Sequence, residues 1–169
     1  MEEERFNEAI TAYTEVIRLN PENAEAYHSR GAAYGYLGQL EYAIRDLDEA
    51  IRLSPDSAET YFYRAIAHHS NGQFSLAVED SGQAISLDAT RGEAYHVRAA
   101  AFLALGDLKE AHRNVIDAAK LGAEDAVIDT AQRIVDRLAA KRLEEFNRFI
   151  RACYNGEPRL AEFNPSDQQ

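Results

Sequence analysis

Histidine and cysteine are the most versatile reactive side chains in this sequence, and their spacing favours packing over chemistry. The chain contains five histidines and one cysteine, Cys153. His68 and His69 are neighbours, so on a helix their rings point to different faces. Cys153 continues an apolar helical face with Phe149 and Ile150, which favours a packing role. Neither a G-x-S-x-G nucleophile elbow nor a phosphate-binding loop occurs. The sequence therefore predicts no enzyme, no metal site and no cofactor.

The elements that position these residues repeat at a fixed interval. Tyr27, Tyr61 and Tyr95 are 34 residues apart, and within each unit apolar residues recur three and four positions apart, as on one helix face. Four further columns keep the same step: Gly38, Gly72 and Gly106; Ala43, Ala77 and Ala111; Ala50, Ala84 and Ala118; Leu19, Leu53, Leu87 and Leu121. The glycines fall where a first helix must end, and glycine adopts the left-handed conformation of such ends without steric cost.

A unit of this length with these columns resembles the tetratricopeptide repeat, a helix–turn–helix unit that stacks into a solenoid. The resemblance implies an all-α fold, a right-handed α-solenoid of such units, to which the residues after 124 are expected to add a long C-terminal capping helix. It also implies a function, that of a protein–protein interaction module or scaffold. Members of the family hold a peptide or a helix of another protein in a concave groove.

The register of the repeat sets the expected domains. The repeat array spans 1–124, with a half repeat at 3–23 and full repeats at 24–57, 58–91 and 92–125. The corresponding helices are expected at about 3–19, 24–37, 41–53, 58–71, 75–87, 92–105 and 109–121. The first of them matches the second helix of a unit, so the chain opens in mid-repeat. Either the chain belongs to a longer protein or the missing helix comes from another subunit.

The repeat breaks after residue 124. Asp129 stands where the next Tyr is expected, yet apolar residues still recur at helical spacing. No Gly or Pro lies between Gly122 and Gly156, which predicts one long helix over 125–154. Its first half is expected to cap the last repeat. Residues 155–169 are rich in Gly, Pro, Ser and Gln and are expected to form a flexible tail.

The resemblance also transfers groove positions, because first helices of successive repeats line the groove in the family. The small residues Ser29, Ala32, Ser70 and Ala100 fall on this face, together with Val97 and Leu103. The main expected contact residues are Glu25, His28, Tyr36, Glu59, Phe62, Tyr63, Ile66, His69, Glu93 and His96. The aromatic residues of the first two repeats are the expected anchors, since aromatic side chains are enriched at binding hot spots.

Glu25, Glu59 and Glu93 occupy one equivalent position in the three repeats. They either form an acidic edge of the groove or stabilise the first turns of their helices against the helix dipole. His28 and His96 lie two repeats apart, and helices packed 8–10 Å apart would separate them by about 20 Å, too far to share a zinc ion.

A family subgroup grips the C-terminal carboxylate of chaperones with Lys, Asn and Arg, whereas this chain has Glu25, Ser29, Tyr63, Glu93 and Val97 at those positions. That activity is not expected, and the expected ligand is basic or neutral.

Arg30, Arg64 and Arg98 recur one position before the small residue of each first helix. These arginines could bind anions. The favoured interpretation is that their side chains pack between helices and their guanidinium groups pair with carboxylates such as those of Asp46 and Asp80.

Composition narrows the partners further. A net charge of −11 and a pI near 4.9 argue against binding to nucleic acid and to an anionic membrane surface. No apolar run approaches the roughly 20 residues of a membrane span, and the acidic start does not resemble a signal peptide. A single cysteine suits a reducing compartment, so a cytoplasmic location is expected, unless the chain is part of a longer protein.

Two apolar surfaces at opposite ends of the chain support a second function, self-assembly into a homodimer. The first helix lacks its usual partner and the last helix extends beyond the array, so both leave apolar side chains uncovered. The expected contact residues are Phe6, Ile10, Tyr13, Leu143, Phe146, Phe149 and Ile150. The competing explanation is that the long helix folds back on its own last repeat.

Overall fold

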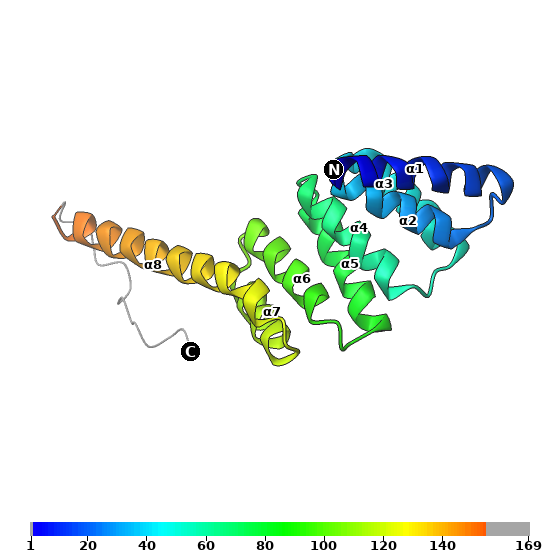
Figure 1. Cartoon of the computed structure of the whole chain (residues 1–169). Coiled ribbons are helices and arrows are strands. Elements are labelled where there is room, and N and C mark those ends of the chain that lie inside the picture. The colour runs from blue at the N-terminus through cyan, green and yellow to red at the C-terminus, as the bar shows by residue number, and fades with distance from the viewer. Residues whose placement is uncertain (1, 155–169) are drawn as a thin grey trace. The chain divides into compact units, whose positions relative to one another are not determined.

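The computed structural model describes residues 2–154, apart from the side chains of 124–128, 145–147 and 149–154 (Figure 1). These residues form helices and no strand: α1 (Glu2–Leu19), α2 (Ala24–Tyr36), α3 (Leu40–Leu53), α4 (Ala58–Ser70), α5 (Phe74–Leu87), α6 (Gly92–Leu105), α7 (Leu108–Lys120) and α8 (Glu124–Tyr154). Each end lies within one residue of the expected position. The expected tail lies outside the described residues.

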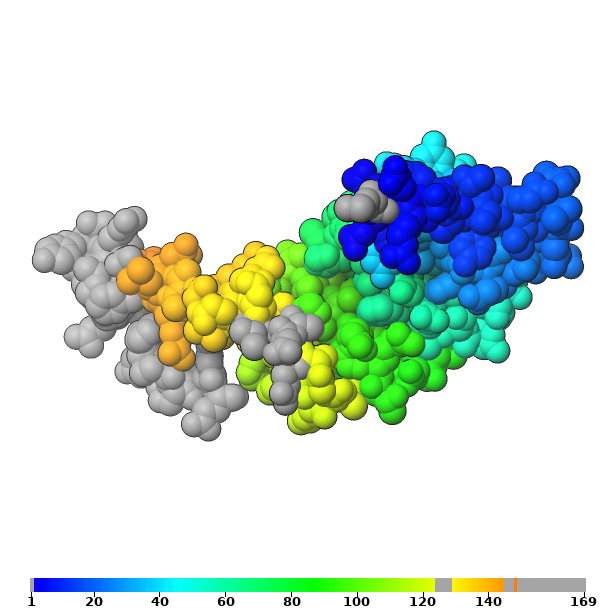
Figure 2. All heavy atoms as spheres, viewed as in Figure 1, coloured from blue at the N-terminus to red at the C-terminus, as the bar shows by residue number. Residues whose placement is uncertain are grey.

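The chain divides within α8, between Ala131 and Gln132, into two compact units. The first unit holds α1 to α7 and the start of α8, and the second holds the rest of α8. In the first unit, side chains fill the space between neighbouring ribbons (Figure 2). No helix of the described residues is both long and apolar enough to cross a membrane.

Helix ends in the first unit follow local sequence signals. The side chains of Asn23, Ser57 and Asp107 accept hydrogen bonds from backbone N–H groups at the starts of α2, α4 and α7. Each cap satisfies a donor that the first helical turn leaves unpaired. Gly38, Gly72 and Gly106 take positive φ angles of 70°, 75° and 85°, which confirms the left-handed turns expected there.

Small residues let the two helices of each repeat approach closely. Ala43, Ala77 and Ala111 on the second helices are fully buried. A Cβ added to Gly31 would lie 2.9 Å from Cγ of Leu47, so a side chain at this position requires a shift of Leu47 or of the helices. In the sequence register, the equivalent pairs are Ala65 with Ser81 and Ala99 with Val115.

In the first two repeats, the arginine column (Arg30, Arg64 and Arg98) pairs with carboxylates of the neighbouring helix, as the favoured interpretation predicts. Arg30 donates to Asp46 at 2.6 and 2.9 Å, and Arg64 donates to Asp80 at 2.8 and 2.6 Å. Bidentate pairs of this kind tie the first helix of a repeat to the second. Arg98 differs, because it donates to the neutral amide oxygen of Asn114.

The first helix is not left bare. It packs against α2, where the ring of Phe6 stacks on Tyr36 at 4.8 Å between centroids. Ile10 and Tyr13 are half-buried, so the surface expected to be uncovered is covered in part. On α8, Leu143 is 61% exposed. Among the other residues expected to make a dimer contact, the side chains of Phe146, Phe149 and Ile150 lie outside those that the structure describes.

Candidate functional site

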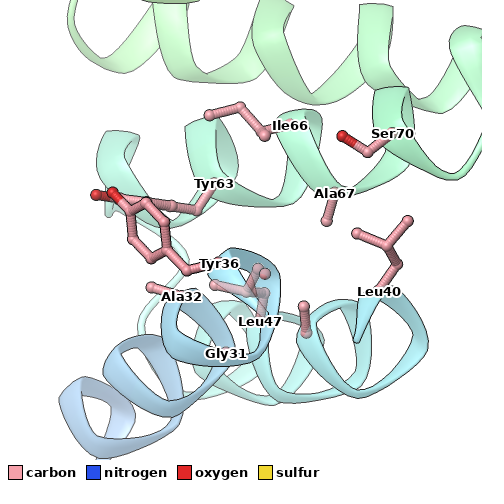
Figure 3. A pocket seen from close by; sticks show the side chains of 11 residues that line it. Gly31, Ala32, Tyr36, Leu40, Leu47, Tyr63, Ile66, Ala67 and Ser70 are labelled. Atoms are coloured by element: carbon pink, nitrogen blue, oxygen red, sulfur yellow. The ribbon is translucent and has the colours of Figure 1, made fainter. Parts of the chain in front are cut away.

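Two adjacent hollows lie against α4. The first, of about 110 Å³, is bounded by α2, α3 and α4 and is almost entirely apolar (Figure 3). The second, of about 370 Å³, lies between α4 and α6. Ile66 borders both hollows, so they are neighbours along α4.

Tyr36 and Tyr63 border the first hollow. Tyr36 is 65% exposed, while Tyr63 is half-buried. Figure 3 shows the two rings together at one end of the hollow, with Leu40 and Ser70 at the other. Burial raises the pKa of Tyr63, and a hydrogen bond with the Tyr36 hydroxyl raises it further. The Tyr63 phenol therefore stays neutral near pH 7, and the two hydroxyls place polar groups at the rim of an apolar hollow.

Ring contacts hold these aromatic residues in place. The ring of Tyr63 meets His28 edge-on at 5.3 Å and Phe62 edge-on at 5.6 Å. The guanidinium group of Arg91 lies over the ring of Phe62, 5.4 Å from its centroid. Such contacts restrict rotation, so a ligand would meet surfaces that are already ordered.

The structure places seven of the ten expected groove residues around the hollows. The first hollow takes Tyr36, Tyr63 and Ile66, and the second takes Phe62, Ile66, His69, Glu93 and His96. Three others border neither hollow: Glu25, His28 and Glu59.

The environment of His28 differs from that of the two glutamates. His28 is half-buried, and its Nδ1 lies 3.1 Å from the hydroxyl of Thr60. Glu25 and Glu59 are exposed, and Glu25 accepts a long hydrogen bond of 3.4 Å from Ser29. The exposed carboxylates are consistent with either role expected of them.

The expectation that Leu103 faces the groove is wrong, because its side chain is fully buried. Its equivalent in the second repeat, His69, is only half-buried. An apolar side chain gains more free energy from burial than an imidazole does, so burial suits the leucine of the third repeat better than the histidine of the second.

Leu40 and Arg91 belong to the site but were missed by sequence reasoning. Leu40, the first residue of α3, borders the first hollow. It recurs with Phe74 and Leu108 at the repeat interval, a signal that could have identified it. Arg91 stands where no other repeat has a cation, so the register gave no indication of its contact with Phe62.

The imidazole of His96 has a perturbed pKa. Burial lowers its pKa, nearby His69 lowers it further, and Asp129 opposes both effects. Its Nε2 lies 3.3 Å from the hydroxyl of Thr130. Within the described part of the chain, no three His, Cys, Asp or Glu side chains gather as metal ligands would. The arrangement offers apolar surface and hydrogen bonds for recognition.

Comparison with known proteins supports the repeat. A family described as TPR repeat matches residues 1–38 and 36–72. No curated protein matches the chain. A crystal structure of MamA is 21% identical, with 81% of this chain and 91% of that chain covered and a TM-score of 0.67.

Two other solved structures are somewhat more similar in sequence. The Arabidopsis OM64 TPR domain is 26% identical over 69% of this chain and 97% of that one, with a TM-score of 0.66. The first TPR of Spaghetti (RPAP3), bound to the HSP90 peptide SRMEEVD, is 25% identical over 69% and 93%, with a TM-score of 0.64. Residues 1–72 thus match the TPR repeat family, and the stacked helix pairs with left-handed glycine turns give the chain the fold of a tetratricopeptide repeat solenoid.

Proposed function

We propose that this chain is a protein-interaction scaffold whose two hollows bind an extended peptide or a helix of another protein. Tetratricopeptide repeat proteins are generally non-catalytic interaction modules, and the RPAP3 neighbour was solved with a peptide bound. The observation that carries the proposal is the exposed ring of Tyr36 beside an almost wholly apolar hollow.

Apolar burial would supply most of the affinity. Tyr36, Tyr63 and Ile66 offer adjoining apolar surface on two helices, and Ile66 is still 37% exposed. An aromatic or aliphatic side chain of a partner would displace water from this surface. Because ring contacts already order Tyr63 and Phe62, binding would cost less conformational entropy than it would on mobile side chains.

The charges favour a basic or neutral ligand. Glu25, Glu59 and Glu93 are all exposed at one repeated position, and the whole chain carries a net charge of −11. The RPAP3 peptide SRMEEVD is acidic. At the positions where the carboxylate-gripping subgroup carries cations, this chain offers glutamates and neutral residues, so an acidic peptide would be repelled.

Peptides selected from a random display library on the immobilised chain would test this proposal. Tyr63→Ala should weaken binding of the selected peptides by about tenfold or more, since truncating a buried interface aromatic commonly costs 2 kcal/mol or more. Ile116→Ala is the matched control, because Ile116 is 41% exposed on α7 and borders neither hollow. Unchanged affinity in Tyr63→Ala, or an equal loss in Ile116→Ala, would refute the site.

The same peptide selection also tests the charge of the ligand. Selected peptides should be basic or neutral, and their association should slow as salt rises if the glutamates attract them. Peptide SRMEEVD should bind poorly. A library that converges on acidic peptides would leave the three glutamates with a role in helix stabilisation alone.

Self-assembly is the second candidate, and exposed apolar side chains on α8 favour it. Val135, Leu138 and Leu143 are 57%, 44% and 61% exposed. A second copy of the chain could cover them in a closed symmetric dimer.

A further inference from the structure

The arginine column provides an internal comparison, because three equivalent arginines meet different partners. Arg64 is the fully paired case: Nε and Nη2 donate to Asp80 at 2.8 and 2.6 Å, and Nη1 donates to Asp48 at 2.7 Å. Arg30 pairs with Asp46 in the same way, and its Nη1 donates to the hydroxyl of Thr14 at 3.0 Å. The guanidinium groups of Arg30 and Arg64 thus each donate hydrogen bonds through three nitrogens.

The third repeat has lost both kinds of acceptor around Arg98. Asn114 stands where the other repeats have Asp46 and Asp80, and Gly82 stands where they have Thr14 and Asp48. Nε of Arg98 donates to Oδ1 of Asn114 at 2.6 Å. The amide nitrogen of Asn114 is itself a donor, bonded to the carbonyl oxygen of Glu110 at 2.8 Å. Among the side chains that the structure describes, Nη1 and Nη2 of Arg98 therefore have no hydrogen-bond acceptor.

The loss of acceptors changes the electrostatics of the group. Burial lowers the pKa of Arg98. Burial also opposes the charge of Arg64, yet hydrogen bonds to Asp80 and Asp48 raise the pKa of that group. A half-buried guanidinium group without a carboxylate is costly, and an added anion would recover that cost.

Arg98 borders a polar pocket of about 430 Å³ between α5, α6 and α7. The pocket shares no residue with the two hollows at α4. The ring centroid of Tyr95 lies 5.3 Å from the guanidinium carbon of Arg98. Arg113 adds a second positively charged side chain to the wall of the pocket. Glu110 and Asp117 also line the pocket, and Lys120 donates to Asp117 at 3.2 Å. The charges of the walls thus nearly balance, while the donors of Arg98 stay unused.

We propose that this pocket is a second binding site, in which Arg98 binds a carboxylate group from outside the chain. The carboxylate would take the place beside Nη1 that Asp48 occupies beside Arg64 one repeat earlier. Two free N–H donors of a planar guanidinium group match the two oxygens of a carboxylate. The volume admits a small free dicarboxylate or a Glu or Asp side chain of a protein segment.

The site can be filled from within the chain, which gives the test a variant that should fold. A Cβ at Gly82 would meet only Nη1 of Arg98, at 3.9 Å, so Gly82→Asp places an internal carboxylate where Asp48 stands in the previous repeat. Asn114→Asp restores the acceptor of the other two repeats. Both variants should unfold at the same or a higher denaturant concentration than the parent chain.

The measurement is the NMR signal of the Arg98 Nε–Hε group during titration at constant ionic strength. Succinate represents a free dicarboxylate, N-acetyl-glutamate amide represents a protein side chain, and succinamide is the neutral control. We expect a saturable shift with one or both carboxylates and none with succinamide. Gly82→Asp should weaken binding at least about tenfold, the equivalent of one charge-assisted hydrogen bond.

The relative affinity of the two carboxylates then assigns the source, free metabolite or protein segment. Inorganic phosphate in the same titration checks selectivity, and stronger binding of phosphate would overturn the carboxylate assignment. Absence of a saturable shift with either carboxylate would overturn the site. So would a succinate response of the Arg98 Nε–Hε signal that persists unchanged in Gly82→Asp.

Discussion

Replacing Gly31 with alanine tests the helix packing on which the first hollow depends. A Cβ at this position would lie 2.9 Å from Cγ of Leu47, 3.2 Å from the carbonyl oxygen of Ala43 and 3.3 Å from Cβ of Asp46. Carbon atoms pack best at about 3.5–4.0 Å. Leu47 is only 1% exposed, so its side chain or the helices must shift to admit the methyl group.

The expected cost follows from two opposing effects. Overpacking a tight core typically costs about 1–3 kcal/mol. Alanine is better than glycine inside a helix by about 0.5–1 kcal/mol. The free energy of unfolding of Gly31→Ala should therefore fall by about 1 kcal/mol, the centre of a range of about 0–2.5 kcal/mol. Gly35→Ala on the same helix is the matched control, since its Cβ would meet only Ala43 at an ordinary 3.9 Å.

Urea unfolding followed by circular dichroism would compare these variants. Gly35→Ala should match or exceed the stability of the parent chain, because only the helix effect operates there. The double variant Gly31→Ala/Leu47→Val should recover stability, because the third repeat has Ala99 and Val115 at these positions. Equal stability of Gly31→Ala and Gly35→Ala would refute the packing argument.

Two further predictions concern pH and assembly. The folded chain holds the pKa of His96 below its unfolded value of about 6.5, so the unfolded chain binds more protons between the two pKa values. The free energy of unfolding should therefore fall as pH drops through about 6.5. It should stop falling below the folded pKa. In urea titrations at several pH values, His96→Gln should flatten this pH dependence, whereas His112→Gln, at an exposed position, should not. Equal pH profiles for the parent chain and both variants would contradict the assignment to His96. Self-assembly through α8 predicts a dimer mass in light scattering that Leu143→Glu converts to a monomer. A parent chain that stays monomeric at high concentration would exclude that candidate.

The helices and turns were predictable because their signals repeat. A glycine that recurs at the repeat interval, as Gly38 and Gly72 do, reflects a backbone requirement that no other residue meets as easily. The pairing of Arg64 with Asp80 was predictable for the same reason, since both positions recur and face each other across one repeat.

What the sequence could not predict are features in which one repeat departs from the others. Phe6 stacks on Tyr36 from a helix that lacks its own repeat partner, so no second example in the chain indicated the contact. Leu103 is buried, although the equivalent residue of the second repeat, His69, lines a hollow. The unpaired donors of Arg98 depend on atomic geometry around Asn114, which register alone does not provide.

The central claim is that the two hollows at α4 are the binding surface, and an NMR titration of the labelled chain with a library-selected peptide tests it most directly. Ile66 borders both hollows, so its signals should change most, together with those of Tyr63 and His69. Signals of Ile116 on α7 should stay unchanged. Unperturbed Ile66 together with shifts confined to the surroundings of Ile116 would contradict the proposed function.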